Sequence, residues 1–275
     1  MDRIMLGDDT DSWEIARRLV KARFDASALP RYPGTIPQSL DAGYACQDAA
    51  IHLWPAPIAG WKVGRIPADW EARLGEERLV GPIFSNRVQR HGALPARFPV
   101  ITGGFAAVEA EFVFVLAQDA PAGKLAWNPG EAAALVKALH VGVEFAGSPL
   151  PDINRLGPPV VVSDYGNNAG LLLGPEVADW RQRLVDGLAC ETFIDGASVG
   201  TGGTHAIDGG VLAALAFALA KGARRGRPLR AGQLVSTGAA TGIHDIVAGQ
   251  HARVAFPGVA DLEVETVVAR PEPGA

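Results

Sequence analysis

The feature that most constrains this chain is the apolar run of residues 105–117, FAAVEAEFVFVLA, which carries two glutamates in its middle. Side chains alternate between the two faces of a strand, so Glu109 and Glu111 point the same way. Apolar residues flank them on that face and fill the opposite one, which indicates a strand buried on both faces. Two unpaired carboxylates there would each cost several kcal/mol or would have to take up protons. A positive group or a proton must therefore accompany them.

The rest of the chain divides into two parts. Residues 1–58 predict a small helical unit, with one helix over residues 11–26 that Asp11 caps and a second over residues 39–54. From residue 59 to residue 270, short apolar runs separated by Gly and Pro predict a β-rich domain. The expected strands are residues 59–64, 78–84, 108–117, 139–147, 159–164, 169–174, 191–199, 233–238, 251–256 and 262–269. Two helices are expected within this domain, over residues 128–140 and 208–226.

Composition excludes several classes of protein. The 275 residues are 48% hydrophobic, which suffices for a large core. A net charge of -5 and a pI near 5.7 provide no basic stripe for phosphates, so nucleic acid is not expected as a partner. Cys46 and Cys190 lie far apart without metal-ligand spacing, which fits a reducing cytoplasm. The acidic amino terminus and the lack of a long apolar segment predict a cytoplasmic protein that is neither exported nor membrane-inserted.

The buried acids have three possible explanations. A carboxylate pair can share a proton, bind a basic partner or bind a divalent cation, and the two residues alone leave these outcomes open. A third acid, Glu144, lies in another short apolar run that precedes a Gly-Ser-Pro turn. Three buried acids favour a metal, and oxygen-only ligation suits Mg²⁺ or Mn²⁺. The alternative is a strand-end Glu144 that pairs with an arginine.

Other segments offer groups that would act near such a metal. Lys62, in GWKVG, would donate a proton or hold an anion there, and the alternative is a surface lysine whose stem packs on the neighbouring tryptophan. Asp164 ends a strand-like run, where functional groups often gather. Ser236 and Thr237 offer hydroxyls beside the backbone amide of Gly238, a combination that can hold a carboxylate. Neither a phosphate-binding loop nor a dinucleotide fingerprint is present.

Taken in order from about residue 40 to residue 268, these motifs resemble a known family. The matching segments are GWKVG, VEAEFVFVL, VEFAGSPL, VVSDYGNNAGLLLG, RGRPLRAGQLVSTGA and GVADLEV. They are similar to the 2-keto-4-pentenoate hydratases and their 2-oxo-3-hexenedioate decarboxylase relatives, within the fumarylacetoacetate hydrolase superfamily. The specific part is the strand with two glutamates two residues apart, followed downstream by a third acid.

The resemblance implies an α+β fold with a mixed β-roll or barrel-like catalytic domain behind the small helical unit. It also implies Mg²⁺ or Mn²⁺, and a homo-oligomeric cytoplasmic enzyme of aromatic meta-cleavage catabolism. Carried over residue by residue, the metal ligands are Glu109, Glu111 and Glu144. The catalytic candidates are Lys62 and Asp164. The substrate-binding candidates are Tyr44, Gln47, Ser236, Thr237 and Gly238.

The reaction that the resemblance implies is addition of water to a 2-hydroxy-2,4-dienoate, which gives a 4-hydroxy-2-oxo acid. The partner is this small acid, and a decarboxylase or an aldolase of the same pathway is a candidate for complex formation. Lys62 would move or steady protons, and Asp164 would orient water or substrate. The segments DYGNNAG and STGAATG depart from the relatives' sequences, so the metal chemistry is predicted more closely than the substrate.

Three other functions are considered beside the hydratase. A 2-oxo-3-hexenedioate-type decarboxylase would need a further cation for the second carboxylate, with Arg155 and His205 as candidates. A noncatalytic 2-oxo-acid binder of the same family is the second. The third, a C–C bond hydrolase, is disfavoured because residues 66–77 contain no histidine for its His-Glu pair.

Overall fold

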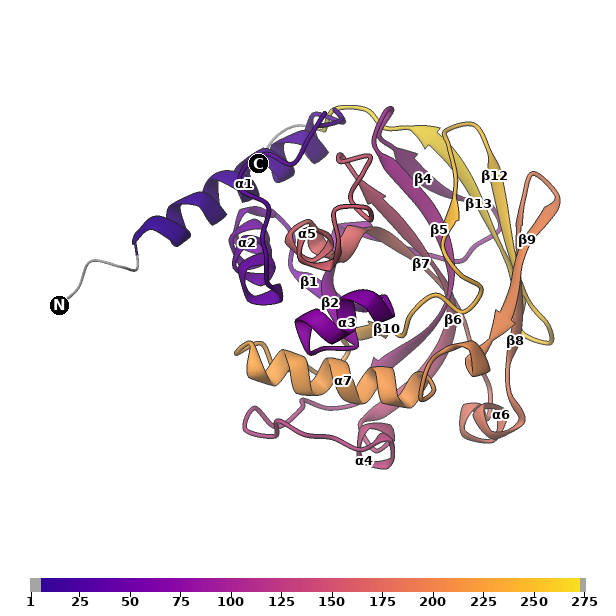
Figure 1. Cartoon of the computed structure of the whole chain (residues 1–275). Helices are drawn as coiled ribbons and strands as arrows, with labels where there is room; N and C mark the ends of the chain where they lie inside the picture. The colour runs from indigo at the N-terminus through magenta and orange to yellow at the C-terminus, as the bar shows by residue number, and fades with distance from the viewer. Residues whose placement is uncertain (1–5, 273–275) are drawn as a thin grey trace.

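The computed structural model describes residues 6–272 and has an α+β fold built on two mixed sheets (Figure 1). The apolar run with two glutamates forms β5 (Phe105–Leu116), which lies inside the eight-stranded sheet. The strand order of this sheet is β2-β1-β10-β5-β6-β7-β3, and β11 also pairs with β5. Its other strands are β1 (Ile58–Arg65), β2 (Arg78–Phe84), β3 (Val88–Arg90), β6 (Val136–Ser148), β7 (Asn168–Glu176), β10 (Leu234–Ser236) and β11 (His244–Asp245).

The second sheet has five strands in the order β4-β13-β12-β8-β9 and packs against one face of β5. Phe112 of β5 meets Phe256 of β12 edge to face, with ring centroids 5.8 Å apart. Phe98 of β4 stacks on Phe145 of β6 at 4.7 Å. The main core therefore lies between the two sheets and covers the apolar face of β5. The strands of this sheet are β4 (Ala96–Val100), β8 (Ala189–Ile194), β9 (Ala197–Gly203), β12 (His251–Phe256) and β13 (Ala260–Val268).

Most of the helices lie on the other side of the eight-stranded sheet, as Figure 1 shows. The helices are α1 (Leu6–Phe24), α2 (Leu40–Leu53), α3 (Ala68–Leu74), α4 (Pro129–Ala133), α5 (Pro158–Ser163), α6 (Trp180–Asp186) and α7 (Val211–Arg224). Single 3-10 turns occur at Ser85–Arg87, Tyr165–Asn167 and Thr204–Ala206. The combination of helices with curled mixed sheets confirms the fold class that the sequence predicts.

The amino-terminal helices pack directly on the sheet domain. Trp54, which follows α2, stacks on Phe84 of β2 with ring centroids 4.7 Å apart. Phe24 of α1 also stacks on Trp54, with ring centroids 4.9 Å apart. Tyr165 meets both Trp54 and Phe84 edge to face. The division of the chain at residue 58 stays a prediction, since one hydrophobic cluster joins the two segments.

Four predictions of local structure are wrong. The single strand expected over residues 191–199 is a hairpin, because the turn at Asp195 and Gly196 separates β8 from β9. Asp11 lies inside α1, which begins at Leu6, so it does not cap the helix. The helix predicted over residues 128–140 is only α4, because the residues from Val136 onward pair with β5 as strand β6. Residues 159–163 fall in α5 and Asp164 follows it directly, so no strand forms there. Two prolines suit the first turn of a helix, and close packing of α5 on α2 overrides the preference of the valines for a strand.

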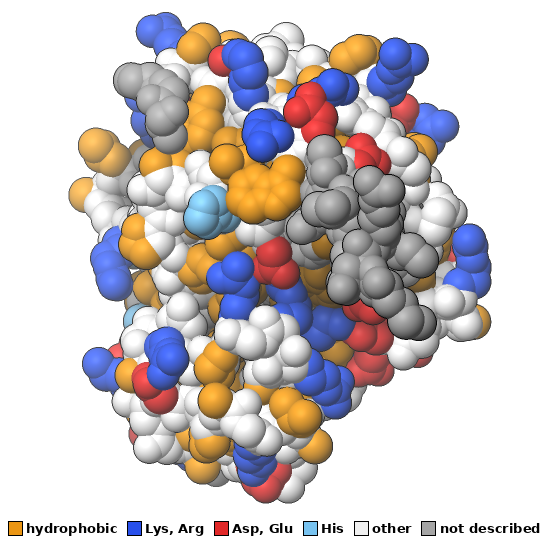
Figure 2. Space-filling model, turned by 90° about the vertical axis from the view of Figure 1, so that its left-hand side faces the viewer, with side chains coloured by type: hydrophobic (Ala, Val, Ile, Leu, Met, Phe, Trp, Pro, Cys, Tyr) orange, Lys and Arg blue, Asp and Glu red, His pale blue; other side chains and the backbone are white. Residues whose placement is uncertain are grey.

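The surface of the molecule mixes charges of both signs. On the face shown in Figure 2, basic side chains are interspersed with acidic and apolar ones. In the described residues, no helix combines the length and the apolar character that a membrane crossing requires.

We expect Gly81→Ala to destabilise the protein. A Cβ atom on Gly81 of β2 would lie 1.9 Å from the carbonyl oxygen of Tyr165, so the strand and the turn after α5 would have to separate. Such overpacking typically lowers the free energy of unfolding by about 1–3 kcal/mol. Urea unfolding measures it, with Gly123→Ala as the control because a Cβ there meets no atom within 4 Å. Equal effects of the two substitutions would contradict this close approach.

Candidate active site

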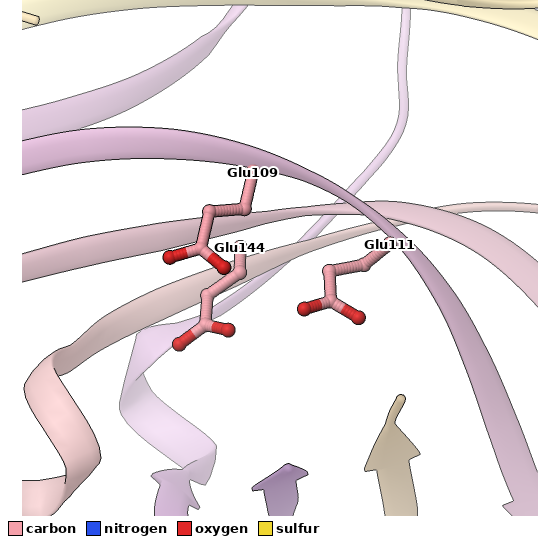
Figure 3. Close-up of side chains that lie close together, drawn as sticks. All are labelled: Glu109, Glu111 and Glu144. Atoms are coloured by element: carbon pink, nitrogen blue, oxygen red, sulfur yellow. The ribbon is translucent and has the colours of Figure 1, made fainter. Parts of the chain in front are cut away.

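The three glutamates predicted as ligands meet on one face of the β5–β6 pair. Glu109 of β5 lies directly opposite Glu144 of β6 in the antiparallel register, and Glu111 follows two residues along β5 on the same face. Figure 3 shows the three carboxylates extending to the same side of the two strands. One oxygen from each lies within 4.8 Å of the others. Within the described part of the chain, this is the one group of acids, histidines or cysteines placed to share a metal ion.

Each of these carboxylates keeps a buried oxygen without a hydrogen-bond partner: Oε1 of Glu109, Oε1 of Glu111 and Oε2 of Glu144. The protein holds the second oxygen of two of them. The Gly238 amide donates to Glu111 Oε2 at 2.7 Å, and Asn168 Nδ2 donates to Glu144 Oε1 at 2.9 Å. In a carboxylate that binds a metal, a hydrogen bond to one oxygen orients the group, and the other oxygen stays free for the metal.

The electrostatics of this cluster are unfavourable without a further cation. Burial is the main cause that raises the pKa of Glu109 to about 7, and Lys62 lowers this pKa while Glu144 raises it. Burial also raises the pKa of Glu111 well above its usual range, with repulsion from the other two acids. Three hard oxygen ligands in a low-dielectric setting fit Mg²⁺ or Mn²⁺, which would replace the protons that the acids otherwise hold.

Lys62 of β1 reaches into the same cluster. Its Nζ lies 3.4 Å from Glu144 Oε1 and donates to the Gly166 carbonyl at 3.1 Å and to Asn167 Oδ1 at 3.2 Å. Burial lowers the pKa of Lys62, but attraction to Glu144, Glu109 and Glu111 outweighs it and raises the pKa above its usual value. Lys62 is therefore a buried, charged ammonium and not a surface residue.

The turn that binds Lys62 has an unusual backbone. Tyr165, Gly166 and Asn167 have φ angles of 60°, 65° and 58°, so three successive residues are left-handed. A non-glycine residue in this region costs free energy and persists only where its surroundings fix it. Here Tyr165 donates to the Ala50 carbonyl at 2.8 Å, and Lys62 holds the other end. The turn thus presents two acceptors to the lysine.

A cavity of about 460 Å³ opens beside the glutamates. Its inner end includes Lys62, Glu109 and Asn167. Apolar walls follow, with side chains such as Val161 and Trp70. The charged side chains farther along the wall are Arg65, Arg78, Asp208 and Asp245. A small acid bound at the carboxylate cluster would extend its chain along these walls.

The late turn predicted to bind substrate lies partly in this cavity. Thr237 and Gly238 line it, whereas Ser236 is buried behind them and is not among its lining residues. The Thr237 hydroxyl donates to the Phe112 carbonyl at 2.9 Å, and the Gly238 amide serves Glu111. The turn therefore fixes the position of Glu111 while its outer surface faces the cavity.

Asp164, the other catalytic candidate, does not line the cavity. Its carboxylate accepts from Arg23 Nε at 2.7 Å and from the Ser148 hydroxyl at 2.5 Å, and the side chain is 1% exposed. This buried ion pair ties α1 to the end of β6 and holds the residue just before the left-handed turn. Asp164 contacts the site through that turn rather than directly.

Tyr44 and Gln47, both on α2, also lie outside the cavity lining. The Tyr44 hydroxyl accepts from the Val80 amide at 3.0 Å. Gln47 donates to the carbonyls of Val80 and Val162 at 3.1 Å and 2.9 Å. These bonds join α2 and α5 to β2, so the two side chains support the wall of the site.

The two arginines on the cavity wall are not the cations that the sequence suggested for a second substrate carboxylate. Arg155 is exposed and pairs with Asp152, and His205 does not line the cavity. Arg65 and Arg78 are on the wall instead. They were missed because arginines at the ends of β1 and β2 carry no local signal of their own. Asn168 was also missed, although the two asparagines of DYGNNAG were a possible signal.

Comparison with known proteins identifies the fold. No protein-family model matches the sequence, and no curated protein matches it. Among solved structures, 4-oxalocrotonate decarboxylase from Pseudomonas putida G7, complexed with magnesium and adipate, matches with a TM-score of 0.81 and 18% identity, over 97% of this chain and 100% of that one. Fumarylpyruvate hydrolase from Pseudomonas aeruginosa, in complex with Mn²⁺ and pyruvate, matches with a TM-score of 0.53 and 18% identity, over 78% and 91%.

The chain has the fumarylacetoacetate-hydrolase-type fold. A third similar structure, 2-hydroxyhepta-2,4-diene-1,7-dioate isomerase from Mycobacterium marinum, has a TM-score of 0.52 and 16% identity, over 77% of this chain and 76% of that one. A decarboxylase, a hydrolase and an isomerase thus share this fold. The fold alone does not select the reaction, which depends on the groups in the cavity.

The buried acids predict how the stability of the metal-free protein depends on pH. The folded protein holds the proton of Glu109 up to about pH 7, whereas an ordinary glutamate releases it near pH 4.5. The free energy of unfolding should therefore fall, by on the order of 3 kcal/mol from this group, as the pH rises through that interval. Urea unfolding with a chelator present measures it.

Glu109→Gln is the matched variant for this measurement, since it removes the titrating group and keeps the shape of the side chain. Its stability should depend less steeply on pH over the same interval. Equal slopes for the variant and the unaltered protein would show that Glu109 is not protonated in the folded state.

Proposed function

We propose that this protein is a divalent-metal-dependent hydratase that adds water to a 2-hydroxy-2,4-dienoate and forms a 4-hydroxy-2-oxo acid. The observation that carries the proposal is the cluster of three buried carboxylate oxygens without partners, of which Glu109 lines the cavity. Buried oxygens of this kind require a proton or a cation, and the adjoining cavity of about 460 Å³ leaves room for a small acid beside that cation.

Glu109, Glu111 and Glu144 would hold Mg²⁺ or Mn²⁺. When bound, the cation would accept the carboxylate and the 2-oxygen of the acid and stabilise the negative charge that develops on that oxygen. The similar structures support this choice, since one contains magnesium with adipate and another contains Mn²⁺ with pyruvate. Both of those organic ligands are carboxylates.

The surrounding residues receive distinct roles. Lys62 holds a proton 3.4 Å from Glu144 and lines the cavity, so it is placed to donate to and accept from the substrate chain. Thr237 and Gly238 form the wall of the substrate cavity next to Glu111, and Ser236 lies behind them. Asp164, Tyr44 and Gln47 act as positioning residues that hold the left-handed turn and the wall.

The charges of the cavity favour a monocarboxylic substrate. Arg65 pairs with Asp208 at 2.8 Å and with Glu71 at 2.9 Å, and Arg78 pairs with Glu77 and with the Asp208 carbonyl. Both guanidinium groups are thus already neutralised. The remaining walls are mostly apolar, which suits a hydrocarbon chain rather than a second carboxylate.

The second candidate is a decarboxylase of a 2-oxo-3-hexenedioate-type acid. The observation that favours it is the presence of Arg65 and Arg78 on the cavity wall, because a second carboxylate needs a cation there. It would have to displace the acids that these arginines bind. The homo-oligomer, the cytoplasmic location and an association with a decarboxylase or an aldolase of the same pathway stay predictions.

Activity with Mg²⁺ or Mn²⁺ and 2-hydroxypenta-2,4-dienoate tests the proposal. Loss of the dienol absorbance, with 4-hydroxy-2-oxopentanoate as product, is expected with the metal and not with a chelator. Glu111→Gln should lower turnover by about 100-fold or more, because it removes a ligand that stabilises developing charge. Glu265→Gln, an exposed glutamate of β13, should behave as the unaltered protein.

Three results would contradict the proposed metal-dependent hydratase. Turnover that persists with the chelator would show that the glutamates do not hold a catalytic metal. Release of CO₂ from 2-oxo-3-hexenedioate, without hydration of the dienoate, would establish the decarboxylase instead. Mn²⁺ binding without any turnover would leave a noncatalytic binder.

A further inference from the structure

One carboxylate of the cavity, that of Asp245, belongs neither to the glutamate cluster nor to an ion pair of the wall. Three acids line the cavity: Glu109, Asp208 and Asp245. Glu109 belongs to the metal cluster, and Asp208 is paired with Arg65 at 2.8 Å. Among the described residues, Asp245 accepts no hydrogen bond and forms no ion pair, and its side chain is exposed to the cavity. An unpaired carboxylate on the wall of such a cavity is free to bind a group that arrives with the substrate.

The strand register places Asp245 at a defined position relative to the metal cluster. It lies on β11, which pairs antiparallel with β5, and it stands opposite Ala107. Ala107 and Glu109 are two residues apart on β5 and share a face, so Asp245 shares that face as well. Diagonal neighbours of this kind have Cβ atoms about 7–8 Å apart. Asp245 is thus beside the metal cluster and too far to belong to it.

The segment that carries Asp245 is held firmly. On one side the Ile246 amide donates to the Ala106 carbonyl at 3.0 Å, and on the other the Ala240 amide donates to the Ala110 carbonyl at 2.8 Å. The neighbouring His244 points to the opposite face, where its Nε2 lies 3.2 Å from the Thr241 hydroxyl. A side chain on an anchored strand is positioned more accurately than one on a free loop.

We propose that Asp245 orients the water molecule that attacks the substrate and accepts its proton; this inference rests on the proposed hydratase function. Hydration occurs at C4, two bonds beyond the carbon that carries the 2-oxygen. The group that positions the water must therefore lie beside the metal cluster, displaced along the substrate chain. Asp245 is the unpaired carboxylate of the cavity with that displacement, whereas Asp164 is enclosed by Arg23 and Ser148.

The step balances without any further reagent. The dienol first loses its 2-hydroxyl proton and gains a proton at C5, which gives the conjugated 2-oxo-3-enoate. The water oxygen then bonds to C4 of this 2-oxo-3-enoate as its proton passes to the Asp245 carboxylate. The electron pair of the C3–C4 double bond shifts to C2–C3, and that of the carbonyl moves onto the 2-oxygen. C3 then takes up a proton as the 2-oxo group re-forms, and Asp245 releases its proton to solvent. The net change is addition of one water across C3 and C4.

The test separates water addition from enolate formation. Asp245→Asn keeps the size of the side chain and removes the base. Its kcat for hydration of 2-hydroxypenta-2,4-dienoate should fall by about 100-fold or more, with little change in KM. Exchange of the C3 protons of 2-oxopentanoate for deuterium, measured by NMR, tests enolate formation alone, because it needs the metal and Lys62 but no addition of water to the substrate. The rate of this exchange should equal that of the unaltered protein. Mn²⁺ affinity, measured by calorimetry, should also be unchanged.

Two further variants complete the design. Asp261→Asn, an exposed strand aspartate paired with Arg253 at 2.9 Å, is the matched control and should hydrate normally. Asp245→Ser also removes the carboxylate and should show the same loss of hydration with normal Mn²⁺ affinity. Agreement between the two variants would exclude a folding defect that is specific to asparagine.

The outcomes distinguish the two proposals. Normal hydration by Asp245→Asn, or a parallel loss of hydration and proton exchange, would overturn the role of Asp245 and leave the hydratase in place. Absence of hydration by the unaltered protein, despite exchange with 2-oxopentanoate, would overturn the proposed function itself.

Discussion

The burial of three carboxylates on one face of two paired strands is the constraint on which the site depends. Glu109 and Glu144 face each other across the β5–β6 register, and a single ammonium, that of Lys62, approaches them. Like charges directly opposite one another destabilise a sheet, and one lysine does not neutralise three acids. A divalent cation bound between the three carboxylates would offset this repulsion. The left-handed turn positions Lys62, and the Gly238 amide orients Glu111.

Much of the fold and of the carboxylate cluster follows from the sequence. The alternation in residues 105–117 places Glu109 and Glu111 together, and most of the predicted strands are present. These predictions succeed because they depend on spacing within one strand. The identification of Glu144 as the third acid needs the pairing of two strands, which the sequence indicates only through its own apolar setting. Its exact position opposite Glu109 required the structure.

The residues whose surroundings the sequence did not predict are placed by long-range contacts. Asp164 was predicted from its place at a strand end, but the preceding segment is helix α5 and Arg23 pairs with the carboxylate. Tyr44 and Gln47 match a motif, yet their polar atoms serve β2 and α5. Asp245 stands in a short segment with a weak strand signal, so only the register with β5 brings it to the cavity. Local patterns contain no information about such partners.

The two ends of the cavity are built differently, and this bears on how one fold supports several reactions. The inner end stands on β5, β6 and β1, each paired with a strand on either side, so the carboxylate cluster and Lys62 are held by the core itself. The outer wall comes from α3, the Thr204–Ala206 turn and β11, which are short and joined by ion pairs such as Arg65–Asp208. Substitutions in the outer wall cost little core stability. Under the proposed function, the charges there, rather than the carboxylate cluster, would decide whether the bound acid takes up water or loses CO₂.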